Sequence, residues 1–198
     1  LETGGIIHYK TPVLKVVTDD KSVTSIIVRN NVIYESDYLI SAGDWHHTIF
    51  ELLAGKFATP LQLDLKNLKK LQPFFSSIQA SFGVNKDLTG LSHFTRFPLE
   101  ENLVSPDGTV YERFEIHNYS YDPTMAPPGK TCIVINFYTS KADYWIGHRR
   151  KNRADYRALK AEFLNKCAAI VTTKLGLEPG DIEVMDLSTP ATFHRYTG

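Results

Sequence analysis

Hydrophobic and polar residues follow two different periods in the second half of the chain. From Phe74 to Val84 they alternate, which predicts a strand whose two faces differ in polarity. From Tyr156 to Leu175 apolar residues recur every three or four positions, which predicts a helix that packs on the sheet and ends at Gly176. The predicted apolar face of the strand is Ile78, Ala80, Phe82 and Val84, and its opposite face is Ser77, Gln79, Ser81 and Gly83.

Other short apolar runs in this half of the chain also read as strands. Hairpin-like loops separate them, and such a succession indicates an antiparallel sheet. The runs are residues 93–97, 110–119, 131–138 and 182–187.

The first third of the chain has a different pattern. Three β-branched runs lie at 13–17, 23–28 and 32–34, and turn residues at 19–22 and 30–31 separate them, which predicts a small antiparallel meander. An apolar run at 38–42 then predicts a strand. A helix at 45–53 is expected to follow, with Asp44 as its N-cap and Gly55 as its stop. Strand, small-residue turn and helix form the α/β arrangement in which ligands bind beyond the end of a strand.

The predicted fold class is therefore α+β. It consists of an antiparallel β-sheet covered by helices, preceded by a small N-terminal β-meander and a strand-helix segment.

Charge and composition narrow the classes of partner. The chain has 22 basic and 22 acidic residues, so no overall field would attract it to nucleic acid, and we expect no nucleic-acid partner. Cys132 and Cys167 lack the short spacing of a metal or redox motif and are expected to be reduced thiols, which weakly favours the cytoplasm. Apolar runs fall short of the ~20 residues that span a bilayer.

The usual catalytic motifs are missing from the sequence. His46 and His47 are neighbours on a predicted helix, so their side chains diverge, and the other five histidines are scattered singly. We therefore expect no metal site. There is no GxSxG, GxGxxG or GxxxxGK[ST] pattern, and no catalytic residue can be assigned.

A basic cluster precedes the long predicted helix. It consists of Arg149, Arg150, Lys151 and Arg153, close in sequence to Tyr144, Trp145 and Tyr156. Stacking on bases with contacts to phosphates is one interpretation. A solvated start of the helix is the favoured one, and a peripheral contact with a membrane surface is a weaker alternative.

Aromatic residues make up 12% of the chain and gather on the predicted strands at 110–119 and 131–138. A sheet of this composition can form the wall of a pocket for a long apolar ligand, or it can be an ordinary core. The pocket candidates are Phe82, His117, Tyr119, Phe137 and Trp145.

The segment IHNYSYDPTMAPPGKTCIVINFY, residues 116–138, resembles a stretch of the phytoene dehydrogenase-like flavoproteins, a family that includes carotenoid desaturases, carotene isomerases and retinol saturases. In that family a Tyr-Asp-Pro loop with Ala-Pro-Pro-Gly-Lys precedes a strand of the substrate domain. Further blocks resemble the same family in the same order. They are GGIIHYKTPVLKVV, SDYLISAGDWHHTIFELLAGKF, FSSIQASFGVNKDLTG, HFTRFPLEE and STPATFHRYTG.

The resemblance implies an FAD-dependent oxidoreductase that acts on a polyene, carotenoid or related isoprenoid lipid by desaturation, saturation or isomerisation. Residues 1–57 would be a partial FAD-binding segment, with the strand and helix at 38–53 as a remnant of a Rossmann-like domain. Residues 58–198 would be the substrate-binding domain, cut before the family's C-terminal flavin segment. Val13, Ser41 and Ala42 occupy positions that border FAD in such proteins.

The family's GxGxxG motif has no counterpart in these 198 residues. We therefore expect this part alone to retain neither FAD nor activity, with FAD present in a longer parent protein. The expected partner is a hydrophobic small molecule, the expected location is the cytoplasm or a membrane surface, and the oligomeric state is left open. A module that binds an apolar ligand or a protein partner without catalysis is the alternative.

Overall fold

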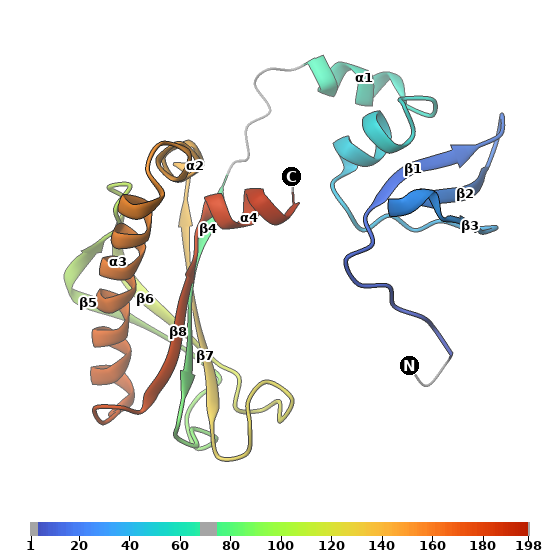
Figure 1. The fold of residues 1–198 in the computed structure, drawn as a ribbon. Helices are drawn as coiled ribbons and strands as arrows, with labels where there is room; N and C mark the ends of the chain where they lie inside the picture. The colour runs from blue at the N-terminus through green and yellow to red at the C-terminus, as the bar shows by residue number, and fades with distance from the viewer. Residues whose placement is uncertain (1–3, 68–74, 198) are drawn as a thin grey trace. The chain divides into compact units, whose positions relative to one another are not determined.

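The computed structural model describes residues 4–67 and 75–197 (Figure 1). Contacts divide the chain into two compact units, Leu1–Gln72 with the last two residues, and Pro73–Tyr196. This division follows α1 (Pro60–Asn67), whereas the boundary expected from sequence precedes it. Assignment of residues 1–57 to an FAD domain and of 58–198 to a substrate domain stays a prediction.

The first unit contains the predicted meander. Strands β1 (Val13–Thr18), β2 (Val23–Val28) and β3 (Ile33–Glu35) pair antiparallel in that order. Asn30 and Asn31, between β2 and β3, have φ angles of 68° and 59°, the left-handed conformation that asparagine tolerates. The turn chemistry read from the sequence is thus confirmed at this position.

The predicted strand at 38–42 is absent from the structure, and this prediction was wrong. Tyr38 and Ile40 are 89% and 92% exposed in an extended segment without a strand assignment. An apolar strand is stable only where neighbouring strands satisfy its backbone groups and cover its side chains, and no described strand pairs with this segment. The remnant of a Rossmann-like domain is therefore not confirmed.

The helix after this segment does form. Its main part is η2 (His47–Leu52), which has π-type hydrogen bonds, and Asp44 accepts a hydrogen bond from the His47 amide at 2.7 Å, as expected of an N-cap. Gly55 ends the turn with a φ angle of 73° and donates its amide to the Ile49 carbonyl.

The second unit contains one five-stranded antiparallel sheet in the order β5, β6, β7, β4, β8 (Figure 1). Alternate residues of β4 are buried, which confirms the face assignment made from its sequence pattern, although Phe74 lies outside the described residues. The strands are β4 (Ser76–Val84), β5 (Phe94–Val104), β6 (Val110–Asn118), β7 (Thr131–Thr139) and β8 (Ile182–Ser188).

Residues 121–130 join β6 to β7, as expected for the proline-rich loop. The loop is braced by short-range turns, with the Met125 amide bonded to the Asp122 carbonyl and the Lys130 amide to that of Pro127. Lys130 also forms an ion pair with Glu183 of β8 at 2.6 Å.

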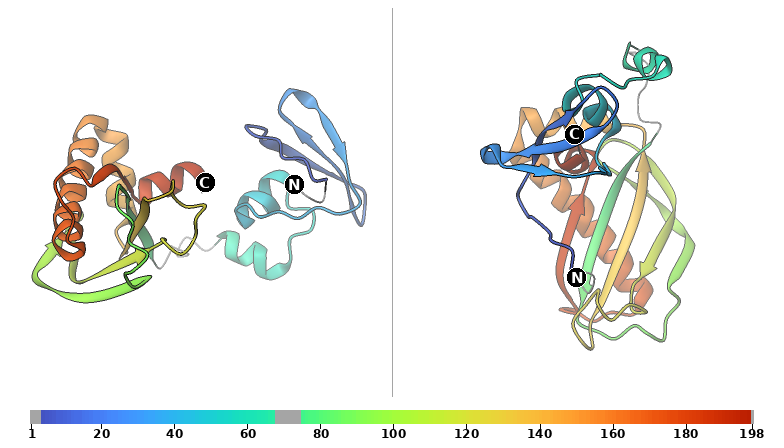
Figure 2. Two further views of the ribbon diagram at one scale, coloured as in Figure 1. Left: turned by 90° about the horizontal axis from the view of Figure 1, so that it is seen from below. Right: turned by 90° about the vertical axis from the view of Figure 1, so that its right-hand side faces the viewer.

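Helices cover one face of this sheet, as the left view of Figure 2 shows. The long α3 (Arg153–Leu175) packs on the apolar face through Phe163, Cys167 and Val171, which belong to the same core as Ile78 and Phe82. Gly176 ends α3 in the left-handed conformation, as predicted. Helix α4 (Pro190–Thr197) follows β8.

A helix break corrects the interpretation of the basic cluster. Residues Ala142–Lys151 form a separate helix, α2, and the Asn152 side chain caps α3 by accepting from the amides of Ala154 and Asp155 at 3.0 and 3.2 Å. Arg149 and Arg150 therefore lie in the last turn of α2, where the helix dipole favours positive charge, and only Arg153 begins α3.

A buried carboxylate ties the sheet to α2. Asp107, between β5 and β6, accepts hydrogen bonds from Trp145 Nε1 and Thr139 Oγ1, both at 2.8 Å. It also accepts from Ser105 Oγ and from the Thr109 amide. Burial raises the pKa of Asp107, but these hydrogen bonds outweigh it and hold the pKa below its usual value.

Candidate functional site

The five-stranded sheet has a second face that α3 does not cover. Antiparallel register places directly opposed residues on the same face, so one row of this open face runs through Phe94, His117, Val134 and Ser81. The pairing Gly83 with Val184 puts a further apolar side chain on this face.

Aromatic and apolar groups are exposed on the open face. Phe94, Tyr138 and Val184 are 48%, 62% and 64% exposed, and the His117 ring lies 5.0 Å from that of Phe94. An uncovered face of an antiparallel sheet is ordinarily polar, so exposed aromatics here mark a surface suited to an apolar contact.

A cleft of about 440 Å³ opens between β6 and β7. The two strands are paired only through His117 with Val134 and Asn118 with Ile133 in the described ladder, so they separate beyond this point. The volume lies within the range of pockets for small ligands. Its lining includes Tyr111, Arg113, Glu115, Asn136, Phe137 and Tyr138.

Tyr111 bridges this cleft. Its hydroxyl donates to the Tyr138 carbonyl at 3.2 Å, and its ring lies 4.8 Å from that of Phe137, which belongs to the core. Burial, with a smaller contribution from the charge of Asp107, raises the pKa of Tyr111 to about 12. The phenol therefore stays protonated near neutral pH and acts as a hydrogen-bond donor.

The five pocket candidates chosen from sequence occupy two environments. Phe137 lines the cleft. His117 lies where β6 and β7 are still paired, and the Tyr119 amide donates a further hydrogen bond from the end of β6 to the Cys132 carbonyl of β7, at 3.0 Å. Phe82 and Trp145 are 1% and 0% exposed in the core beneath the helices, and Phe137, at 3%, belongs to the same core. Core packing accounts for these three residues, and a ligand contact by any of the five stays a prediction.

The three residues expected to border FAD lie in the first unit. Val13 begins β1 and pairs with Val28, while Ser41 and Ala42 are exposed in the extended segment before η2. The Ser41 hydroxyl is 2.8 Å from that of Thr48. The structure brings Ser41 and Ala42 together with the start of a helix, and their role with a cofactor stays a prediction.

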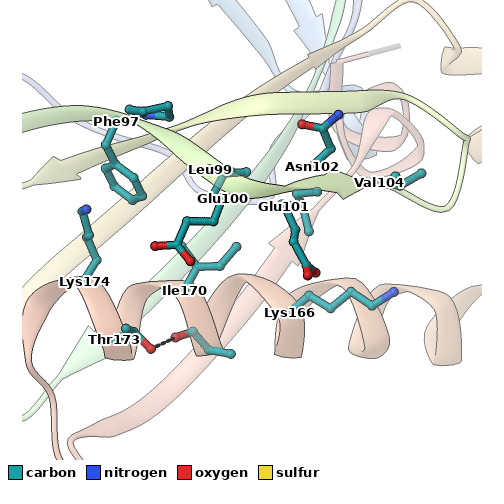
Figure 3. Close-up of a pocket in the computed structure, with 13 residues that line it drawn as sticks. Phe97, Leu99, Glu100, Glu101, Asn102, Val104, Lys166, Ile170, Thr173 and Lys174 are labelled. Carbon is teal, nitrogen blue, oxygen red and sulfur yellow. Dashed lines mark hydrogen bonds between the residues drawn. The ribbon is translucent and has the colours of Figure 1, made fainter.

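A groove of about 740 Å³ lies between β5 and α3 (Figure 3). It forms where the β5 and β6 register shifts between Pro98 and Leu103. Its walls mix Leu99 and Ile170 with charged residues of both signs, including Glu101 and Lys166. The cleft also has charged residues of both signs, Arg113 and Glu115 among them, so charge does not separate the two. The cleft is the candidate for an apolar ligand because it adjoins the exposed ring of Tyr138 on the open face.

Two carboxylates line the cleft: Glu112, which is exposed, and Glu115. Glu115 accepts from Arg96 Nε at 2.6 Å and is held as an ion pair. Burial raises the pKa of the Cys132 thiol and raises that of Cys167 to about 12, so both stay protonated near neutral pH. The cleft can therefore hold and orient a ligand, and the two thiols, which lie outside its lining, add no nucleophile to it.

Within 4–67 and 75–197, no three histidine, cysteine or acidic side chains gather as a metal site would require. None of the helices in these ranges has the length and apolar character needed to cross a membrane.

The fold is similar to that of a solved oxidoreductase from Methanosarcina mazei. The superposition has a TM-score of 0.52 at 18% sequence identity and covers 95% of this chain but only 39% of that protein. A double mutant of putrescine oxidase, made in a redesign of cofactor binding, superposes with a TM-score of 0.42 at 14% identity, over 94% of this chain and 39% of that one. No protein-family model matches the sequence, and no curated protein matches it.

Proposed function

We propose that the chain is the substrate-binding part of an FAD-dependent oxidoreductase whose substrate is a polyene, carotenoid or related isoprenoid lipid. The exposed aromatic face with its cleft carries this proposal. The order of the sequence blocks and the fold shared with an oxidoreductase support it. Because the chain spans only 39% of that oxidoreductase, the rest of such an enzyme would lie outside these residues.

Binding of a hydrocarbon ligand needs apolar area rather than polar anchors. Apolar burial contributes about 25 cal/mol per Å², so ~200 Å² covered by Phe94, Tyr138 and Val184 would give about 5 kcal/mol before ordering costs. Tyr111 and Asn136 would set the edge of the site, together with the charged residues Glu112, Arg113 and Glu115 that also line the cleft.

The division of chemistry follows from the fact that no side chain lining the cleft can accept or donate a hydride. A flavin would supply the electron acceptor or donor when bound. Residues of this chain would hold the ligand against the sheet and exclude water from it. Val13, Ser41 and Ala42 are proposed to contact the flavin's adenosine side in the parent protein.

The visible absorption spectrum of the parent protein tests the proposal. We expect an oxidised flavin spectrum after purification of the protein from its complete reading frame. Anaerobic incubation of the oxidised protein with a polyene should lengthen the ligand's conjugated system as the flavin is reduced, if the reaction is desaturation. If it is saturation, flavin first reduced with dithionite should be reoxidised as the conjugated system shortens. A purified, folded parent that neither contains nor takes up flavin would refute the enzyme proposal.

Substitution within the cleft tests the proposed ligand surface. Tyr138→Ser should weaken polyene binding about tenfold or more, because a large exposed apolar side chain of the site is lost. Tyr196→Ser is the matched control, since Tyr196 is also exposed but lies on α4, outside the cleft. Equal effects of the two substitutions would contradict the assignment of the site.

A non-catalytic module that binds apolar ligands is the second candidate. The observation in its favour is that the second unit has its own core and its own exposed aromatic face. This candidate predicts that the parent protein contains no flavin but still binds polyenes, and that Tyr138→Ser weakens this binding.

A further inference from the structure

A third pocket of the second unit is rich in cationic side chains. It measures about 500 Å³ and lies among α2, α3, α4 and β8. Five cationic side chains and one carboxylate reach it: Arg149, Arg153, Arg157, Lys160, Arg195 and Asp186. We refer to it as the basic pocket.

The helices bring these cations together from distant parts of the sequence. Arg153, Arg157 and Lys160 are spaced by four and three residues, so they share one face of α3. Arg149 comes from the last turn of α2, and Arg195 comes from α4. Like charges at this spacing repel each other, and an anion bound among them would relieve this repulsion.

Acidic side chains neutralise little of this charge. Asp186 lies 3.8 Å from Lys160, and this is the one ion pair that the described residues form with the pocket's cations. Asp155, the nearest acidic residue along α3, is instead paired with His148 at 2.5 Å. This surplus of positive charge is local to the pocket, because the whole chain has equal numbers of acidic and basic residues.

The floor of the basic pocket is fixed and largely apolar. Tyr156, Leu164 and Leu187 are buried, and the Tyr156 hydroxyl lies 2.7 Å from that of Thr189. A concave site with a low-dielectric floor focuses the field of the cations at its rim. The pocket therefore differs from a solvated basic surface, in which each charge is separately hydrated.

We propose that the basic pocket binds a ligand through a phosphate or diphosphate group. Guanidinium groups match phosphate oxygens through paired hydrogen bonds, and four of the five cations are arginines. A single carboxylate would neutralise only one of these charges, whereas a diphosphate has enough charge and enough oxygens for several of them. A soluble phosphorylated compound and a phospholipid headgroup share this chemistry.

Titration with inorganic pyrophosphate tests the soluble source. Isothermal titration calorimetry on the 198-residue chain at low salt should show saturable binding that weakens as salt is added. Arg157→Gln and Arg195→Gln should each weaken it about tenfold or more, since each removes a charge-assisted hydrogen bond. Both residues are exposed, so neither substitution should disturb the core.

Arg150→Gln is the matched control. Arg150 neighbours Arg149 at the end of α2 and is exposed, but it does not line the basic pocket, so its loss should change affinity by no more than about twofold.

Sedimentation with vesicles tests the lipid source. Neutral phosphatidylcholine vesicles are compared with vesicles that also contain phosphatidic acid, which carries an exposed phosphomonoester. Binding to the second kind alone, reduced by Arg157→Gln but not by Arg150→Gln, supports the proposal with a lipid as the ligand. Binding of neither probe, or equal losses in the Arg157 and Arg150 variants, would overturn it.

Discussion

Asp107 is the residue whose replacement should change stability most clearly. Its carboxylate accepts from Trp145, Thr139, Ser105 and the Thr109 amide, and its side chain lies in a buried position between the sheet and α2. Asp107→Asn keeps the shape but replaces one accepting oxygen with a donating amino group, so about two of the four donors lose their acceptor.

The expected loss follows from the hydrogen bonds removed. A hydrogen bond to a charged group contributes about 1.5–3 kcal/mol, and a buried donor left unpaired costs about 1–3 kcal/mol. Because such terms are not additive, we expect the free energy of unfolding of the second unit to fall by about 3–4 kcal/mol.

Urea denaturation followed by tryptophan fluorescence measures this change. The chain has two tryptophans, so a Trp45→Phe background leaves the buried Trp145 as the reporter of the second unit. Glu178→Gln is the control, since Glu178 is exposed and its side chain has no hydrogen-bond partner among the described residues. A loss below about 1 kcal/mol for Asp107→Asn would refute the reasoning, because it would equal that of an ordinary surface change.

The pH dependence of the same variant gives an independent check. The folded pKa of Asp107 lies below its ordinary value of 3.8, so its contribution is present above that value and is lost as pH falls through the folded pKa. The stability of the unsubstituted chain should therefore decrease more steeply below about pH 4 than that of Asp107→Asn. Parallel curves would show that the carboxylate is not held ionised.

Three further substitutions or reactions test other parts of the structure. Gly83→Ala should destabilise the second unit by about 1–3 kcal/mol in the same urea assay, because the added Cβ would lie 2.5 Å from Val184 Cγ1. Adding Val184→Ala to this variant should restore most of the lost stability, since it removes the clashing group. Asn152→Ala removes the α3 cap and should cost about 1 kcal/mol, with unchanged stability counting against the helix break. In the folded chain at neutral pH, iodoacetamide should modify Cys132 slowly and Cys167 more slowly still, because burial raises both thiol pKa values and raises that of Cys167 more. Mass spectrometry measures the two rates. Rapid labelling of Cys167 would contradict its placement in the core.

Patterns that depend on a residue and its near neighbours could be predicted from the sequence. The two-residue period of β4 gave its faces, and the asparagine pair gave the turn before β3. The same period already placed Phe82 with Ile78, Ala80 and Val84, so it indicated a core position for Phe82 rather than a place on the open face. The break before α3 was also readable, since Asn152 is a preferred N-cap residue.

Features that depend on distant segments could not be predicted in this way. The strand expected at 38–42 needs neighbouring strands, and apolar character alone does not supply them. The cleft depends on where β6 and β7 stop pairing, which no local pattern encodes. Similarly, Arg153, Arg157 and Lys160 could be placed on one helix face from their spacing, but the approach of Arg195 depends on tertiary packing.

The side chains of the cleft restrict how the proposed reaction can occur. The phenol, carboxylate, guanidinium, amide and hydroxyl groups that line it are not electron acceptors, so none of them can take up a hydride from a hydrocarbon. Any change in the number of double bonds must therefore draw on a bound electron carrier. It follows that removal of flavin from the parent protein should abolish turnover of the polyene while leaving its binding to the cleft. Turnover that persisted in the flavin-free protein would show that a reactive group has been overlooked on this surface.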